Sequence, residues 1–177
     1  KISVIVRYMA RIIAFSNQKG GVGKTTSGAL LAEALGYEFI DMDEEIEKRT
    51  GKTIPEIFSE DGETRFRELE RDLVMELAGK NGYVIGCGGG ALADLVNAEA
   101  LRETSTLVYL TASVDEILDR TGKESHRPLL KVDDPQKTVE DLIKKRSPVY
   151  ERYAEIEIDT TGKSAEAVAQ EIRRRLP

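Results

Sequence analysis

The sequence predicts an α/β protein in which helices cover both faces of a parallel β-sheet. Short apolar runs alternate with longer amphipathic segments along the chain, which is typical of parallel strands joined by helices. A glycine-rich turn follows the first clear strand, where phosphate-binding loops occur in such folds. The length of 177 residues suits a single domain spanning residues 1–177.

Apolar runs and helical periodicity place the elements in order. Strands are expected at residues 11–16, 37–41, 83–87, 105–110 and 155–159. Helices are expected at residues 24–36, 44–51, 63–79, 113–122, 137–154 and 164–176, with a short helical or turn segment at 53–62.

Individual residues mark where these helices begin and end. Gly36 and Gly51 are typical helix stops, and Ser113 is a suitable N-terminal cap. Pro148 predicts a break in the helix at 137–154, because proline cannot donate a backbone hydrogen bond. The polar, proline-containing stretch between the helices at 113–122 and 137–154 predicts a lid loop over about 122–135.

Composition excludes several classes of function. A net charge of -6 argues against broad nucleic-acid binding, which usually needs a basic face. Cys87 and His126 are the only residues of their kinds, so neither a disulfide framework nor a Cys/His metal cluster is expected. No apolar run is long enough to span a bilayer, and we expect a cytoplasmic protein. Residues 1–8, before Met9, are either a leader or an additional strand.

The stretch SNQKGGVGKTTSG, residues 16–28, has the arrangement that a nucleoside triphosphate needs. Glycines allow backbone N–H groups to face the phosphates at a helix N-terminus. Lys24 is expected to reach the β- and γ-phosphates, and the Thr25 hydroxyl to bind Mg²⁺. The predicted contacts to ATP in this loop are Gly20, Gly21, Val22, Gly23, Lys24, Thr25 and Thr26.

The loop departs from the usual phosphate-loop pattern at two positions. Gln18 stands where glycine is usual, and Lys19 adds a lysine. In this the loop resembles the deviant loop of ParA/MinD-type partition and division-site ATPases, in which the extra lysine crosses a dimer interface. That resemblance covers only about residues 11–26.

Two carboxylates follow the second expected strand. Asp41 and Asp43 are spaced i, i+2 at a strand end, where ligands of open α/β sheets bind. One can serve Mg²⁺ and the other can accept a proton from a substrate hydroxyl. A helix cap beside a solvated acid is the alternative. Further along, GCGGGAL at residues 86–92 is either a flexible turn or a place where a ligand touches the backbone.

The segments FIDMDEEIEKRTG, DGETRFRELE, GCGGGAL, HRPLL and KKRSPVYER occur in this order and together resemble shikimate kinase. The resemblance runs from about Gly28 to Asp159. It implies a P-loop kinase fold with three layers and five parallel strands in the order 2-3-1-4-5. It also implies transfer of the γ-phosphoryl group of ATP to the 3-hydroxyl of shikimate, a step of aromatic amino-acid biosynthesis.

The resemblance implies a set of residues that bind the acceptor. Asp43 matches the acid that holds the shikimate hydroxyls and is the candidate base. Arg67 and Arg146 match the pair that binds the substrate carboxylate, an anion that suits planar guanidinium groups. Gly88, Gly89 and Gly90 match the glycine run whose backbone touches the substrate.

The resemblance also implies residues on the nucleotide side. Asp41 matches the acid of the Mg²⁺ shell, and Arg120 matches the arginine that stacks on adenine. Arg127 matches the lid arginine that reaches the transferred phosphoryl group, where with Lys24 it would have a catalytic role. Residues 159–164 match the adenine-side loop.

The sequence is also compatible with three other functions. A nucleotide-switch ATPase would dimerise through Lys19, and a folded but catalytically poor protein would bind ATP without turnover. A kinase for another hydroxylated acid, such as gluconate, fits the arginine and glycine set less well. We expect a monomer that binds shikimate, and neither nucleic acid nor a membrane. Cys87 is expected to be a small buried residue and not a nucleophile.

Overall fold

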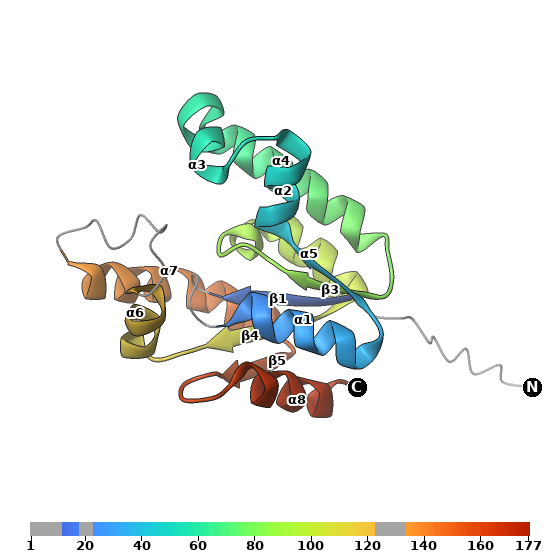
Figure 1. Cartoon of the computed structure of the whole chain (residues 1–177). Coiled ribbons are helices and arrows are strands. Elements are labelled where there is room, and N and C mark those ends of the chain that lie inside the picture. Colours follow the sequence, from blue (N-terminus) through green and yellow to red (C-terminus); the bar gives the residue numbers. More distant parts are fainter. Residues whose placement is uncertain (1–11, 18–22, 123–133) are drawn as a thin grey trace, which may run out of the picture.

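A computed structural model describes residues 12–17, 23–122 and 134–177 (Figure 1). Its strands form one five-stranded sheet in the order β2-β3-β1-β4-β5, and each neighbouring pair is parallel. The strands are β1 (Ile12–Asn17), β2 (Glu38–Asp41), β3 (Tyr83–Gly86), β4 (Ser105–Thr111) and β5 (Ile156–Asp159). The predicted α/β class with parallel strands is therefore confirmed.

Helices lie on both faces of the sheet (Figure 1). One apolar cluster joins the sheet to α1 (Lys24–Leu35), α6 (Val114–Gly122) and α8 (Ala165–Arg175). The other joins it to α2 (Met42–Thr50), α4 (Gly62–Ala78), α5 (Leu95–Thr104) and the end of α7 (Pro135–Tyr153). Successive residues of β4 enter opposite clusters, as the two-residue repeat of a strand requires.

The helix ends follow the predicted signals. Gly36 and Gly51 both have a φ of 68° and end α1 and α2 in the left-handed conformation that glycine adopts without strain. The Ser113 hydroxyl accepts a hydrogen bond from the backbone N–H of Glu116 at the start of α6. Residues 54–61 form two short helical turns, α3 (Ile54–Glu56) and η1 (Ile57–Asp61).

Helix α5 was not predicted from the sequence. Its first residues, Leu95 and Val96, are 54% and 49% exposed, while the polar Asn97 beside them is buried. This reverses the usual apolar pattern of an amphipathic helix. The one sequence feature that indicates the start of this helix is Asp94, a typical N-terminal cap. Its side chain accepts a hydrogen bond from the backbone N–H of Val96.

The predicted break at Pro148 is wrong, because α7 continues from Pro135 to Tyr153 with Pro148 inside it. A proline inside a helix costs about 3 kcal/mol. Tyr150 and Tyr153, which follow it, are buried in the core at 1% and 5% exposure. Burial of two aromatic side chains offsets that cost and holds the last turn in helical form.

Some predictions fall outside the described residues. These are the predictions for residues 1–8, for Gln18, Lys19, Gly20, Gly21 and Val22, and for the lid segment with His126 and Arg127. In the part of the chain that the structure does describe, no helix combines the length and the apolar character needed to cross a bilayer.

Candidate functional site

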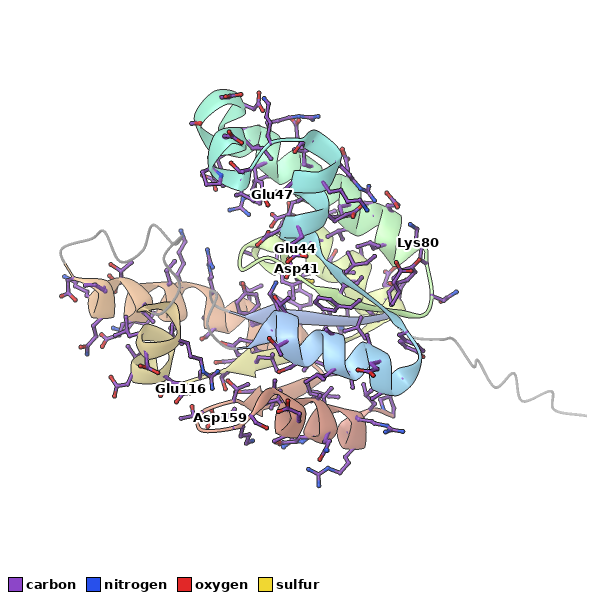
Figure 2. The ribbon with its side chains drawn as sticks, viewed as in Figure 1. Asp41, Glu44, Glu47, Lys80, Glu116 and Asp159 are labelled. Atoms are coloured by element: carbon purple, nitrogen blue, oxygen red, sulfur yellow. The ribbon has the colours of Figure 1, made fainter. Side chains whose placement is uncertain are left out.

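Asp41 forms the centre of the site at the carboxyl end of β2. It is the last residue of the strand, and its Oδ1 accepts from the backbone N–H of Asp43 at 3.1 Å, which caps α2. Its Oδ2 accepts from Lys24 Nζ at 3.2 Å and from Thr25 Oγ1 at 2.9 Å. The Asp41 side chain is only 7% exposed. The structure thus brings together three predicted residues from α1 and β2, and Figure 2 shows Asp41 where β2 passes into α2.

The neighbouring strand leaves room for this cluster. Gly86 ends β3 and pairs with Asp41 across the sheet. A Cβ atom on Gly86 would lie 3.4 Å from Asp41 Oδ2 and 3.4 Å from Lys24 Nζ. The carboxylate and the ammonium group therefore lie close to the backbone of β3, at the distance of ordinary contact with an added Cβ atom.

The glycine run after β3 lies against the polar side chains of α2 and α4. A Cβ atom on Gly88 would be 2.7 Å from Asp43 Oδ1 and 3.3 Å from Glu70 Oε1. A Cβ atom on Gly90 would be 2.4 Å from Arg67 Nη1. An added side chain at either position would force Asp43 or Arg67 to move, so in the native structure these two side chains lie directly against the backbone of the glycine run.

Arg67 is held by two carboxylates on its own helix. Its Nη1 donates to Glu70 Oε2 at 2.7 Å, and its Nε and Nη2 donate to Glu63 Oε1 at 3.3 and 3.1 Å. A guanidinium group has five N–H donors. The contacts among the described residues therefore leave donors that can bind a further anion.

Glu70 is a functional candidate that the sequence analysis missed. It is 1% exposed, and burial raises the pKa of its carboxyl above the ordinary value, although Arg67 opposes that shift. The spacing between Arg67 and Glu70 is i, i+3, which places both side chains on one face of a helix. That spacing was the signal available in the sequence.

Helix α7 carries the second predicted arginine to the same region. Arg146 is half-buried and precedes Tyr150 by four residues, so both project from one side of the helix. The Tyr150 hydroxyl donates to the backbone carbonyl of Gly89 at 2.6 Å. This bond connects α7 directly to the glycine run.

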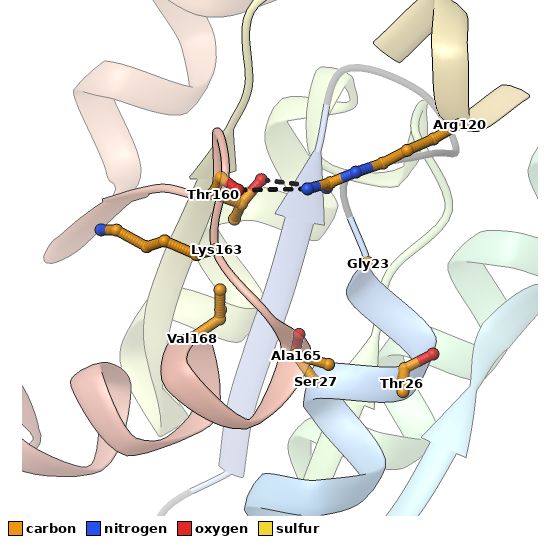
Figure 3. Close-up of a pocket in the computed structure, with 8 residues that line it drawn as sticks. All are labelled: Gly23, Thr26, Ser27, Arg120, Thr160, Lys163, Ala165 and Val168. Carbon is orange, nitrogen blue, oxygen red and sulfur yellow. Dashed lines mark hydrogen bonds between the residues drawn. The ribbon is translucent and has the colours of Figure 1, made fainter. Parts of the chain in front are cut away.

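The nucleotide-side residues line a separate hollow, drawn in Figure 3. A cavity of about 230 Å³ lies between the start of α1 and the segment that follows β5. Arg120 donates to the side chain and the carbonyl of Thr160 at 3.4 and 3.2 Å and pairs with Glu116 at 2.7 Å. The lining residues are Gly23, Thr26, Ser27, Arg120, Thr160, Lys163, Ala165 and Val168. The predicted residues Gly23, Thr26 and Arg120 therefore line one cavity. Thr160 and Lys163, from the adenine-side loop predicted at residues 159–164, line it as well.

Cys87 lies between the cluster at Asp41 and the glycine run, and the prediction that it is buried is confirmed. Burial raises the pKa of its thiol to about 12. A thiol in that state stays protonated at neutral pH, which makes it a poor nucleophile.

Comparisons with known proteins agree with this geometry. The family model described as Shikimate kinase matches residues 20–177. A shikimate kinase of Methylococcus capsulatus is 42% identical over 152 residues, which are 86% of this chain and 85% of that protein. A shikimate kinase of Rhodococcus erythropolis is 44% identical over 156 residues, which are 88% and 92% of the two chains.

Solved structures give the same result. The structure of a shikimate kinase from Acinetobacter baumannii in complex with shikimate superimposes with a TM-score of 0.87 at 41% identity, covering 93% of this chain and 91% of that one. These relatives lend no support to the resemblance of the phosphate loop to partition ATPases. The protein belongs to the shikimate kinase family.

Proposed function

We propose that the protein transfers the γ-phosphoryl group of ATP to the 3-hydroxyl of shikimate. The observation that carries the proposal is the cluster of Asp43, Arg67 and the glycine run at one edge of the sheet. It combines a carboxylate for a hydroxyl, a guanidinium group for a carboxylate, and close backbone on a third side. Shikimate has both of these functional groups, a carboxylate and hydroxyls.

The acceptor would lie between α4, α7 and the glycine run. Arg67 would bind its carboxylate through donors that Glu63 and Glu70 do not occupy, and Arg146 would add a second cation from α7. Asp43 would accept a hydrogen bond from the hydroxyl that attacks the phosphoryl group. Its position at the start of α2 is fixed by the bond from its own N–H to Asp41.

The phosphates would lie at the N-terminus of α1, between the acceptor and the cavity lined by Arg120. Phosphoryl transfer depends on positioning and on neutralisation of charge more than on covalent help. Lys24 is held at the strand end by Asp41, from where it would contact the transferred group. Gly23, with a φ of 78°, turns the backbone into the first helical turn. Lid residue Arg127 stays a prediction of the sequence.

The donor set also fits Mg²⁺. Thr25 Oγ1 and Asp41 Oδ2 are 2.9 Å apart, which is about the spacing of neighbouring ligands in an octahedron with bonds of about 2.1 Å. Both atoms are hard oxygen donors of the kind that this ion prefers. Bound there, Mg²⁺ would neutralise charge on the phosphates. A cytoplasmic location and a monomeric state are part of the proposal.

The proposal is tested by ADP release from Mg-ATP, measured with and without shikimate. We expect release that depends on shikimate, and a loss of at least about 100-fold in the Asp43→Asn variant, because general acid–base groups contribute about 10² to 10⁴. Gluconate in place of shikimate should give no stimulation. In the proposed site two arginines surround the carboxylate of a rigid ring, and gluconate is a flexible open chain.

A matched control is Glu44→Gln, which removes the same charge from the next residue. Glu44 is exposed on the first turn of α2 (Figure 2), so its variant should keep the parent rate. ADP release without dependence on shikimate, in a protein that binds ATP, would contradict the proposal. It would favour the alternative of an ATP-binding protein with little kinase activity.

A further inference from the structure

The hydrogen bond from Tyr150 to Gly89 joins two parts of the site that are 61 residues apart in the sequence. Tyr150 is 1% exposed, and its hydroxyl lies 2.6 Å from the carbonyl oxygen. The bond is partly buried, and its loss would remove an ordinary hydrogen bond that water can replace only in part. The bond therefore fixes the middle of the glycine run against α7.

Tyr150 is itself held firmly in place. Its ring packs against Tyr109 of β4 with the ring centres 5.2 Å apart. The Tyr109 hydroxyl lies 3.3 Å from the Ser147 hydroxyl, one turn back along α7. Strand β4, helix α7 and the glycine run thus form one packed unit in which the tyrosine ring has little freedom.

The position of the glycine run matters because its two outer residues touch polar side chains. Gly88 lies against Asp43, and Gly90 lies against the Arg67 guanidinium group. The middle residue, Gly89, carries the bond to Tyr150, and Arg146 lies one turn before Tyr150 on α7. The bond therefore links α7, which carries Arg146, to the glycine run that lies against Asp43 and Arg67.

We infer that Tyr150 is a positioning residue that sets the affinity of the site for a carboxylated, hydroxylated acceptor. It acts through the carbonyl of Gly89. The identity of the acceptor rests on the proposed function, whereas the hold of Tyr150 on the glycine run does not. Nucleotide binding should be independent of Tyr150, because the cavity lined by Arg120 lies between α1 and the segment after β5.

The test is the Tyr150→Phe variant, which removes the hydroxyl and keeps the ring. We expect the KM for shikimate to rise about three- to tenfold, the effect of losing one ordinary hydrogen bond. The KM for ATP and kcat should stay within about twofold of the parent values. A general loss of folding would instead lower the active fraction and leave both KM values unchanged.

Tyr153→Phe is the matched control. Tyr153 is buried at 5% exposure on the same helix, and no hydrogen bond of its hydroxyl to the glycine run occurs among the described residues. Its variant should keep the parent KM for shikimate. An unchanged KM in Tyr150→Phe, or an equal rise in both variants, would overturn the inference.

Hydrogen exchange without substrates supplies a readout that needs no turnover. The peptide that covers residues 88–92 should exchange at least about threefold faster in Tyr150→Phe than in the parent, and at the parent rate in Tyr153→Phe. Unchanged exchange in Tyr150→Phe would overturn the inference. A parent protein that does not respond to shikimate would refute the proposed function, while faster exchange would still support the hold of Tyr150 on the glycine run.

Discussion

The close contact between Gly88 and Asp43 allows a sharp test of how the acceptor side works. An alanine at position 88 would place its Cβ atom 2.7 Å from Asp43 Oδ1, where ordinary contacts begin near 3.4 Å. The carboxylate oxygen would therefore have to retreat by about 0.7 Å. Gly88 is not among the described glycines with positive φ, so the substitution adds no backbone strain and acts through its contacts with Asp43 and, more weakly, Glu70.

The expected loss follows from the role proposed for Asp43. Misplacement of a reacting group by about 1 Å costs on the order of 100-fold in rate. For a retreat of about 0.7 Å we expect kcat to fall by about 10- to 100-fold, which corresponds to about 1.4 to 2.7 kcal/mol in the barrier. Because Asp43 lies at the edge of the core, the midpoint of thermal unfolding should change by only a few degrees.

The assay is steady-state kinetics with shikimate for the parent and for Gly88→Ala. Gly79→Ala is the matched control, since Gly79 has a φ of -84° and its added Cβ atom would meet nothing closer than 3.7 Å. A kcat in Gly88→Ala within about twofold of the parent value would refute the assignment of Asp43 to the reacting hydroxyl.

Three further outcomes follow from buried groups. Gly28→Ala should lower the free energy of unfolding, measured by urea denaturation, by about 1–3 kcal/mol, because its Cβ atom would lie 2.5 Å from the Phe39 ring. Adding Phe39→Leu should restore part of the loss, and an unchanged free energy of unfolding in Gly28→Ala would contradict this prediction. The raised pKa of Glu70 means that the folded state holds its proton more tightly, so this group's contribution to stability falls as the pH rises above 4.5. Thermal melts should therefore show the parent losing stability relative to Glu70→Gln over that range, and a difference independent of pH would refute the assignment. Cys87, with a pKa of about 12, should react with iodoacetamide at pH 8 only after unfolding, and rapid alkylation of the folded protein would contradict its burial.

Much of the fold could be predicted because local signals agree with the final packing. The apolar runs that became β3 and β4 are buried on both faces, and such strands stand out in any sequence. Gly36 and Gly51 ended their helices as expected because only glycine takes the left-handed conformation without cost. Helix α5 was not predicted because its exposed apolar residues and its buried Asn97 reverse the usual amphipathic pattern of a helix.

The candidate site was predictable only where residue type limits the chemistry. Lys24, Thr25 and Asp41 belong to patterns with few other uses, and the structure places them in contact. The contacts of Glu70 and Tyr150 depend on tertiary packing, since Glu70 lies against Gly88 and Tyr150 reaches Gly89. Helical spacing from the predicted arginines was their one local signal. The same packing overrode the expected break at Pro148.

Transfer of the phosphoryl group to shikimate is tested directly by following the labelled γ-phosphoryl group of [γ-³²P]ATP with Mg²⁺ and shikimate present. We expect the label to appear in shikimate 3-phosphate in the parent protein, and this transfer to be lost in Asp43→Asn and retained in Glu44→Gln. Label that appears only as inorganic phosphate, at a rate independent of shikimate, would contradict kinase activity and indicate an ATPase.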